Sequence, residues 1–153
     1  MNNNSITEKY LSRLRERCFF EESNQLSVIY ESSTKILLFL VESPKPSNLK
    51  HLTFSRLKEV AKYPSDLPIH NFKLILAILT DERVNILVEV FEAHDIESDE
   101  SIILTFNEVT DFIIQNKFIN PFTEEEISES EFSNMVTTFF SISDELLGEL
   151  NVH

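Results

Sequence analysis

The stretch ILVEVFEAHDIESDESIILTF, residues 86–106, decides the fold class. Two runs in it, 86–91 and 101–106, are rich in β-branched and aromatic residues, and the second run alternates apolar and polar side chains. An acidic, polar segment, 94–100, lies between them. This pattern predicts a β-hairpin with a long tip. Because the other periodic segments of the chain are helical, we expect a mostly helical α+β fold.

Helical periodicity precedes the hairpin. Ser5 and Glu8 form a capping-box pattern ahead of apolar residues at four-residue spacing. Thr53 or Ser55 is expected to cap a short helix, and Pro68 is expected in the first turn of another. The predicted helices are 5–18, 26–41 after a break over 19–24, a short one through Leu57, Val60 and Ala61 that ends before Pro64, and 69–80.

Helical signals also follow the hairpin. Asn107 is expected to cap one helix, and Thr123 with Glu126 has the pattern of a second capping box. The apolar residues of 132–140 have helical spacing, and Ser143 is expected to restart a last helical turn. The C-terminal segment is therefore predicted to be helical throughout.

The order of helices, hairpin and helix over 26–115 resembles the winged-helix fold. The resemblance rests on element order and carries no residue signature. It implies that the helix over 69–80 is a recognition helix and that the hairpin is the wing. At 153 residues, the chain is expected to form one domain. Its expected parts are an N-terminal helical extension (1–25), a winged-helix-like core (26–115) and a C-terminal helical segment (121–153).

Composition excludes several classes of enzyme. Gly148 is the single glycine. A P-loop needs two glycines, a dinucleotide-binding fingerprint needs three, and a nucleophile elbow needs a glycine on each side of the nucleophile, so none of these motifs can be present. Cys18 is the single cysteine, so neither an intrachain disulfide nor a cysteine-based zinc site can form. The four histidines are scattered without paired ligand spacing: His51, His70, His94 and His153. We expect no enzymatic activity, no cofactor and no metal.

The ends and apolar runs of the chain bear on its location. The N-terminus is polar and acidic, unlike a signal peptide. The longest apolar run, Ile36 to Val41, is far too short to span a bilayer. We expect a cytoplasmic protein with no membrane association.

Charge is distributed unevenly. Residues 1–62 carry ten basic and seven acidic side chains, whereas 63–153 carry three basic and nineteen acidic ones, and the net charge is −13. Lys9, Arg13, Arg15 and Arg17 make the first helix basic. We expect this helix to pair with the acidic C-terminal part, within the chain or between subunits.

The same charges argue against DNA binding, which is the default use of a winged helix. The predicted wing holds four carboxylates, which repel a phosphate backbone. The predicted recognition helix offers only His70, Asn71 and Lys73. Direct nucleic-acid binding is therefore not expected. Winged-helix modules also serve as protein docking units, and an acidic wing suits that use.

The candidate partner-binding residues are acidic or apolar. Spacing of Asp95, Glu97 and Asp99 resembles the start of a calcium loop, but the required glycine and final glutamate are missing. The acids of 124–126 either contact a partner or lie in the first turn of a helix, where the helix dipole stabilises negative charge. The apolar residues either dock on their own domain or line an oligomer interface. The full set is Glu97, Asp99, Glu100, Glu124, Glu125, Glu126, Glu129, Phe132, Met135, Val136, Phe139 and Phe140.

Three functions remain open. The first is a non-enzymatic adaptor subunit of a larger complex of bacterial or phage type. It docks on a protein partner with a basic surface, and a homo-oligomer is one possible arrangement. The second is a dimeric winged-helix regulator that binds DNA through the basic first helix and 70–73. The third is an acidic mimic of nucleic acid that inhibits a DNA-binding enzyme.

Overall fold

A computed structural model describes residues 3–19 and 26–151. Residues 20–24 of the expected helix break lie outside the described residues, and so does His153. The elements are α1 (Asn3–Phe19), α2 (Leu26–Glu42), the 3-10 helix η1 (Pro46–Asn48), α3 (Phe54–Val60), α4 (Ile69–Leu79), β1 (Leu87–Asp95), β2 (Glu100–Leu104), α5 (Phe106–Gln115), β3 (Phe118–Ile119), β4 (Glu126–Ile127), α6 (Glu129–Met135), β5 (Val136–Ile142) and α7 (Asp144–Asn151). One sheet has the strand order β2-β1-β5, and β3 pairs with β4.

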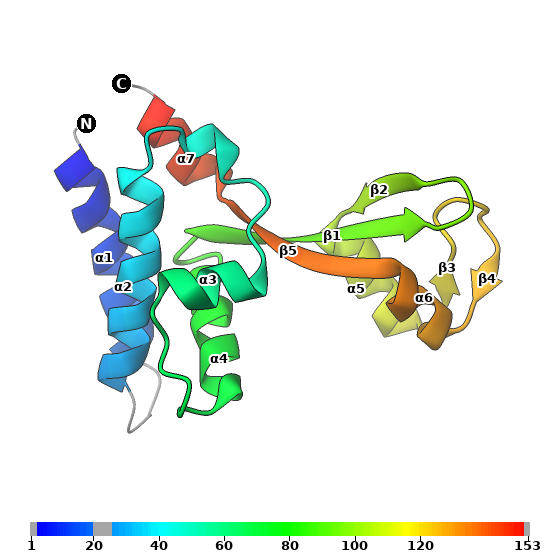
Figure 1. The fold of residues 1–153 in the computed structure, drawn as a ribbon, viewed down its shortest axis with the longest axis horizontal. Coiled ribbons are helices and arrows are strands. Elements are labelled where there is room, and N and C mark those ends of the chain that lie inside the picture. Colours follow the sequence, from blue (N-terminus) through cyan, green and yellow to red (C-terminus); the bar gives the residue numbers. More distant parts are fainter. Residues whose placement is uncertain (1–2, 20–25, 152–153) are drawn as a thin grey trace. The chain divides into compact units, whose positions relative to one another are not determined.

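The chain folds into two compact units. The first unit comprises 1–88 and 140–153, and the second unit comprises 89–139. The chain therefore leaves the first unit in β1 and returns to it in β5, so that the second unit is a continuous insertion (Figure 1). The division into two compact units does not test whether 1–153 is a single domain, which stays a prediction.

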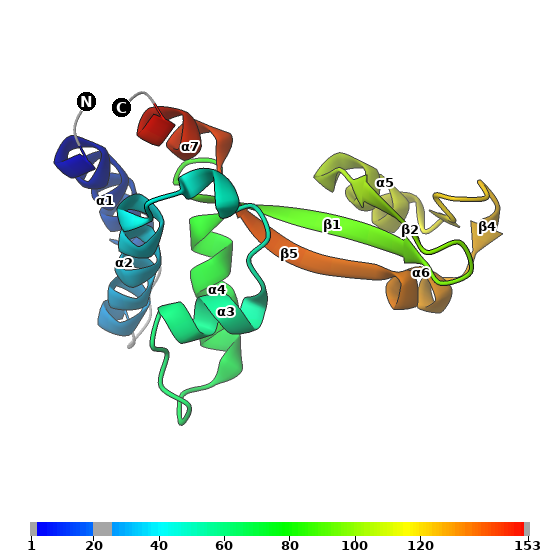
Figure 2. The same cartoon turned by 45° about the horizontal axis from the view of Figure 1, so that its top comes forward.

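Helices α1, α2 and α4 build the core of the first unit (Figure 2). The four-residue spacing in α1 places Ile6, Tyr10, Leu14 and Cys18 on one buried stripe, as predicted. Phe72 of α4 is fully buried, with the rings of Phe54 and Tyr63 at centroid distances of 5.1 and 5.3 Å. Aromatic packing thus ties α3 and the following turn to α4.

The returning segment completes this core. Leu52 and Phe140 exchange two backbone hydrogen bonds of 2.7 Å, and the Ile142 amide donates to the Leu49 carbonyl. The Ser143 hydroxyl donates to the Asn85 carbonyl and accepts from the Leu146 amide. The last helix therefore starts after Ser143, as predicted, and is held to the first unit at its beginning.

The second unit has a separate, aromatic core. The β1–β2 hairpin pairs Phe91 with Leu104 and Ala93 with Ile102, which confirms the predicted hairpin. Strand β1 is longer than expected and β2 begins one residue earlier than expected, so only 96–99 connect them. Three phenylalanine rings from α5, β3 and α6 pack at centroid distances of 5.2 to 6.5 Å: Phe112, Phe118 and Phe132. Together with Ala93, Leu104 and Val109, these residues form the core.

The predicted starts of three helices need correction. Ser5 does not precede its helix as a cap, because α1 already includes Asn3. Thr105, and not Asn107, caps α5, because its hydroxyl accepts from the Glu108 amide while the Glu108 carboxylate accepts from the Thr105 amide. Pro68 occupies the N-cap position of α4 instead of its first turn. All three helices nevertheless lie where periodicity places them.

The predicted helices over 123–140 need larger corrections. Thr123 and Glu126 form no capping box: Glu124 has a left-handed φ of 63°, and Glu126 belongs to β4. Helix α6 starts after Ser128, whose hydroxyl accepts from the Glu131 amide. It ends at Met135, because the β-branched run that begins at Val136 enters strand β5.

The mostly helical α+β fold class is confirmed. The order of elements over 26–115 is also as predicted, but β2 and α5 belong to the second unit, whereas α2, α3 and α4 belong to the first. The winged-helix likeness therefore stays a prediction.

Candidate interaction surface

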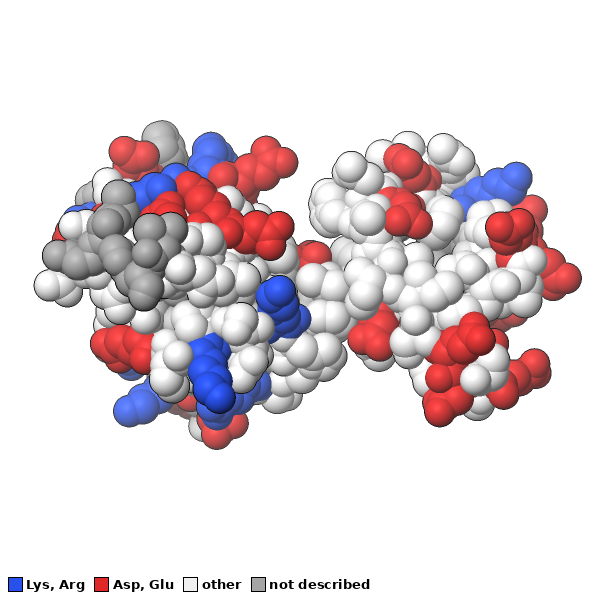
Figure 3. Space-filling model, turned by 90° about the horizontal axis from the view of Figure 1, so that it is seen from above, with Lys and Arg blue, Asp and Glu red and all other residues white. Residues whose placement is uncertain are grey.

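The negative charge of the chain is concentrated in the second unit. Its 51 residues include thirteen acidic side chains and a single basic one, Lys117, which gives a net charge of −12. The first unit is nearly neutral, with twelve basic and thirteen acidic residues. Figure 3 shows one face, on which acidic side chains are spread over the second unit. The uneven charge predicted from the sequence thus coincides with a structural division.

The basic first helix is neutralised within the first unit. Arg13 donates two hydrogen bonds to the Glu145 carboxylate, at 2.8 and 3.0 Å, and Lys9 contacts both Glu145 and Glu149. The Arg13 guanidinium, with hydrogen bonds from Asn85 and Lys9, lowers the pKa of Glu145 to about 2. The expected pairing of this helix with the acidic C-terminal part is confirmed, within the chain.

The hairpin tip presents exposed carboxylates on an ordered turn. The Asp95 carboxylate accepts hydrogen bonds from the Glu97 amide and the Ser98 hydroxyl, and the Asp99 amide donates to the Asp95 carbonyl. This turn holds Glu97, Asp99 and Glu100 in solvent. Among them Ile96 is 87% exposed. The tip therefore combines an apolar side chain with surrounding negative charge.

A second acidic segment follows strand β3. The Asn120 carboxamide oxygen accepts from the amides of 122 and 123, and this turn exposes Glu124 and Glu125. Glu126 lies in β4, while Glu129 lies in the first turn of α6, where the helix dipole favours an acid. The dipole interpretation thus applies to Glu129 and not to 124–126.

These acids lack internal counterions. Among the described residues, ion pairs are formed by none of Glu97, Glu100, Glu124, Glu125, Glu126 and Glu129. Asp99 lies 3.5 Å from the imidazole of His94. With Ile96, these residues define what we call the acidic surface.

The apolar residues proposed from the sequence do not share a helix face. Phe132 is buried in the core of the second unit and Phe140 in that of the first, and Phe139 is also buried. Met135 and Val136 are half-buried. The exposed apolar residues of the second unit lie elsewhere, on α5 and on the hairpin. Those of α5 are Phe106 at 60%, Ile113 at 63% and Ile114 at 75%, and those of the hairpin are Ile96 at 87%, Ile102 at 37% and Ile103 at 57%. The exposed residues of α5 were not predicted from the sequence, because apolar side chains of a helix are normally assigned to a core.

Metal-ligating side chains do not cluster in the parts of the chain that the structure covers. Within 3–19 and 26–151, no three His, Cys, Asp or Glu side chains are placed to hold a metal ion. Cys18 is a buried free thiol. None of the described helices is long and apolar enough to cross a membrane. The distinctive chemistry of this chain is therefore its surface charge.

Comparison with known protein families, curated proteins and solved structures finds no match to this chain.

Proposed function

We propose that the protein is a non-catalytic adaptor that docks through the acidic surface of its second unit onto a basic surface of another protein. The observation that carries this proposal is the net charge of −12 on 51 residues with one basic side chain. A cytoplasmic setting belongs to the same proposal, since the single cysteine is kept as a buried thiol.

Unpaired carboxylates on an ordered turn suit recognition of a basic partner. Like charges concentrated on one unit raise the rate of encounter with an oppositely charged surface and disfavour acidic partners. Ile96 protrudes among these charges and provides an apolar anchor, which is the kind of residue that binds in a desolvated pocket at the centre of an interface. Charge supplies the long-range attraction, and Ile96 supplies contact.

The same surface disfavours nucleic acid as the partner. Phosphate binding gains affinity when lysine and arginine release counterions, and the second unit has only Lys117 for this purpose. Helix α4 buries Phe72, Ile75 and most of its other apolar side chains, so a small polar face remains near its N-terminus. Protein is the partner class that these charges favour.

Site-specific photocrosslinking tests the proposal. A photoreactive amino acid replaces Ile96 at the tip, and a matched control places it at Lys73, an exposed residue of the first unit. In cells of the source organism we expect one protein to crosslink at position 96 and not at position 73. Crosslinks to nucleic acid, or equal patterns at both positions, would overturn the proposal.

The captured partner then allows a quantitative test. We expect Glu97→Lys with Glu100→Lys to slow association at least about tenfold at low salt, with the difference shrinking as salt screens the charges. Glu82→Lys, which reverses an exposed acid of the first unit, is the matched control. Equal association rates for both variants would refute docking through the acidic surface.

A further inference from the structure

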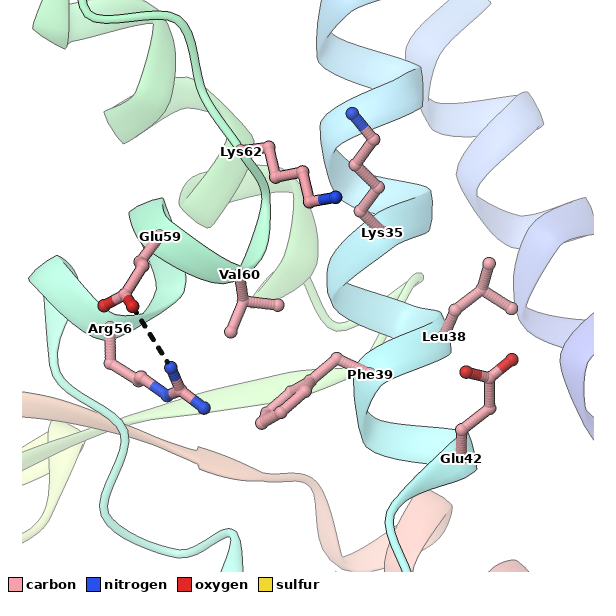
Figure 4. Close-up of a pocket in the computed structure, with 8 residues that line it drawn as sticks. All are labelled: Lys35, Leu38, Phe39, Glu42, Arg56, Glu59, Val60 and Lys62. Atoms are coloured by element: carbon pink, nitrogen blue, oxygen red, sulfur yellow. Dashed lines mark ion pairs between the residues drawn. The ribbon is translucent and has the colours of Figure 1, made fainter.

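A shallow groove lies between helices α2 and α3 of the first unit (Figure 4). Its volume is about 410 Å³, and Leu38, Phe39 and Val60 provide apolar side chains. Lys35, Arg56 and Lys62 place cationic groups around them. An apolar floor with a cationic rim favours a ligand that is itself apolar and acidic.

The rim is paired in part, since the Lys35 ammonium lies 3.5 Å from the Glu31 carboxylate. Arg56 lies over the Phe39 ring, 5.5 Å from its centroid, and 3.6 Å from the Glu59 carboxylate. Lys62 follows α3 with a left-handed φ of 51° and forms no ion pair with any described residue. Its side chain extends toward α2 in Figure 4. Lys62 is therefore a cation held at the groove without an internal counterion.

The α3 side of the groove, with Arg56, Glu59, Val60 and Lys62, lies in a basic segment of the chain. Residues 43–73 contain six basic and two acidic side chains, a net charge of +4 in a protein of −13. Glu42 and Glu59 also line the groove, and they would repel the continuous phosphate backbone of a nucleic acid. The local charge thus favours a segment that carries isolated carboxylates among apolar side chains over a continuous polyanion.

Helix α5 of the second unit has the complementary character. Val109 and Phe112 face the core of the second unit, while Phe106, Ile113 and Ile114 are exposed on another side of the helix. The helix contains Glu108 and Asp111 and no basic residue. The carboxylate of Asp111 is exposed and unpaired within the described residues. This face is apolar with negative charge beside it.

We infer that the protein self-associates, with the exposed face of α5 in one copy seated in the α2–α3 groove of a second copy. Apolar side chains of α5 meet Leu38, Phe39 and Val60, while Asp111 meets the cationic rim. The contact joins two different patches, so repetition of it forms a ring or an open chain of copies. It uses residues outside the acidic surface and is independent of the proposed docking function.

Sedimentation velocity of the full chain over a range of concentrations tests this inference. We expect a mass above that of the monomer, rising with concentration. Ile113→Asp and Lys62→Glu are each expected to weaken association at least about tenfold, because one buries a charge and the other removes a cation from the rim. Lys73→Glu, an exposed lysine outside the groove, is the matched control.

Charge exchange makes the test specific. Asp111→Lys alone should also weaken self-association, whereas an equimolar mixture of the Asp111→Lys and Lys62→Glu chains should recover it in part. A wild-type chain that stays monomeric, or one whose association is unchanged by these variants, overturns the inference. Glu97→Lys at the acidic surface should leave self-association intact, so the two proposals fail separately. Displacement of the self-associated chain by duplex DNA would instead identify the groove as a nucleic-acid site.

Discussion

Replacement of Glu145 by Gln tests how the C-terminal helix is held to the first unit. The Glu145 carboxylate accepts two hydrogen bonds from Arg13, one from Lys9 at 3.1 Å and one from Asn85 at 3.0 Å. Gln keeps the size of the side chain and one acceptor oxygen but removes the charge. The variant therefore isolates the ionic part of the contact between α1 and α7.

The magnitude follows from the pKa of Glu145. These contacts lower it from 4.5 to about 2, chiefly through the Arg13 hydrogen bonds. Each unit of pKa corresponds to about 1.36 kcal/mol, so the whole lowering of the pKa corresponds to about 3 kcal/mol of stabilisation. Because the Glu145 side chain is 34% exposed, solvent screening reduces the expected loss at pH 7 to about 1–2 kcal/mol.

Urea unfolding of both chains as a function of pH measures this contribution. A carboxyl whose pKa is lower in the folded state contributes stability above its unfolded pKa, and loses it as pH falls through the folded pKa. The difference between wild type and Glu145→Gln should be full at pH 7, shrink below about pH 4.5, and nearly vanish at about pH 2. Dependence of the free energy of unfolding on urea should keep the same slope.

Two results would contradict this reasoning. A difference that stays constant between neutral and acidic pH would show that Gln acts through packing and not through charge. Equal stability at pH 7 would show that the negative charge of Glu145 contributes nothing to folding. The double variant Arg13→Gln, Glu145→Gln should be less destabilised than the sum of the two single variants.

Two further predictions concern the lone glycine and the second core. Gly148→Ala should raise the free energy of unfolding by about 0.5–1 kcal/mol, because a methyl group at this helical position meets nothing within 4 Å; a lower thermal midpoint would contradict this. Phe132→Ala should cost the second unit about 3–4 kcal/mol through loss of ring contacts with Phe112 and Phe118. Hydrogen exchange should then accelerate in α5 and α6 and stay slow in α1 and α2, whereas acceleration in all four helices would show one cooperative core.

Local patterns predicted the elements where only one structure suits them. The stripe through Ile6 and Tyr10 has only a helical period, and the runs around Val88 and Ile103 are β-branched with a polar turn between them. In these segments propensity and hydrophobic period agree. Thr53 also caps α3 as one of the two expected candidates.

Local patterns misled where two structures fit the same residues. Apolar positions at 132, 135, 136, 139 and 140 match a helix, but Val136 and the two threonines after it prefer a strand. Thr123 and Ser128 both begin a capping-box pattern. Thr123 lies in the turn that the Asn120 side chain stabilises, so only Ser128 caps a helix. Burial of Phe132 and Phe140 in different units depends on long-range contacts, which sequence spacing does not encode.

The acidic residues of the candidate surface were identifiable because exposure is the default for unpaired carboxylates. Ile96 and the exposed face of α5 were not, since an apolar side chain near apolar neighbours is normally assigned to a core. Only the observed core shows that Val109 and Phe112 use one side of α5 and leave Ile113 and Ile114 in solvent.

The discontinuity of the first unit has a consequence for how the protein is made. Ribosomes release a chain from its N-terminus, so α1 emerges long before its partners Glu145 and Glu149. All the residues of the second unit are synthesised in that interval. Lys9 and Arg13 therefore lack their carboxylate partners on α7 until that helix has been synthesised. The apolar surface that Leu146 covers is exposed for the same time. The part of α1 that α7 covers is thus exposed on the nascent chain until α7 has been synthesised.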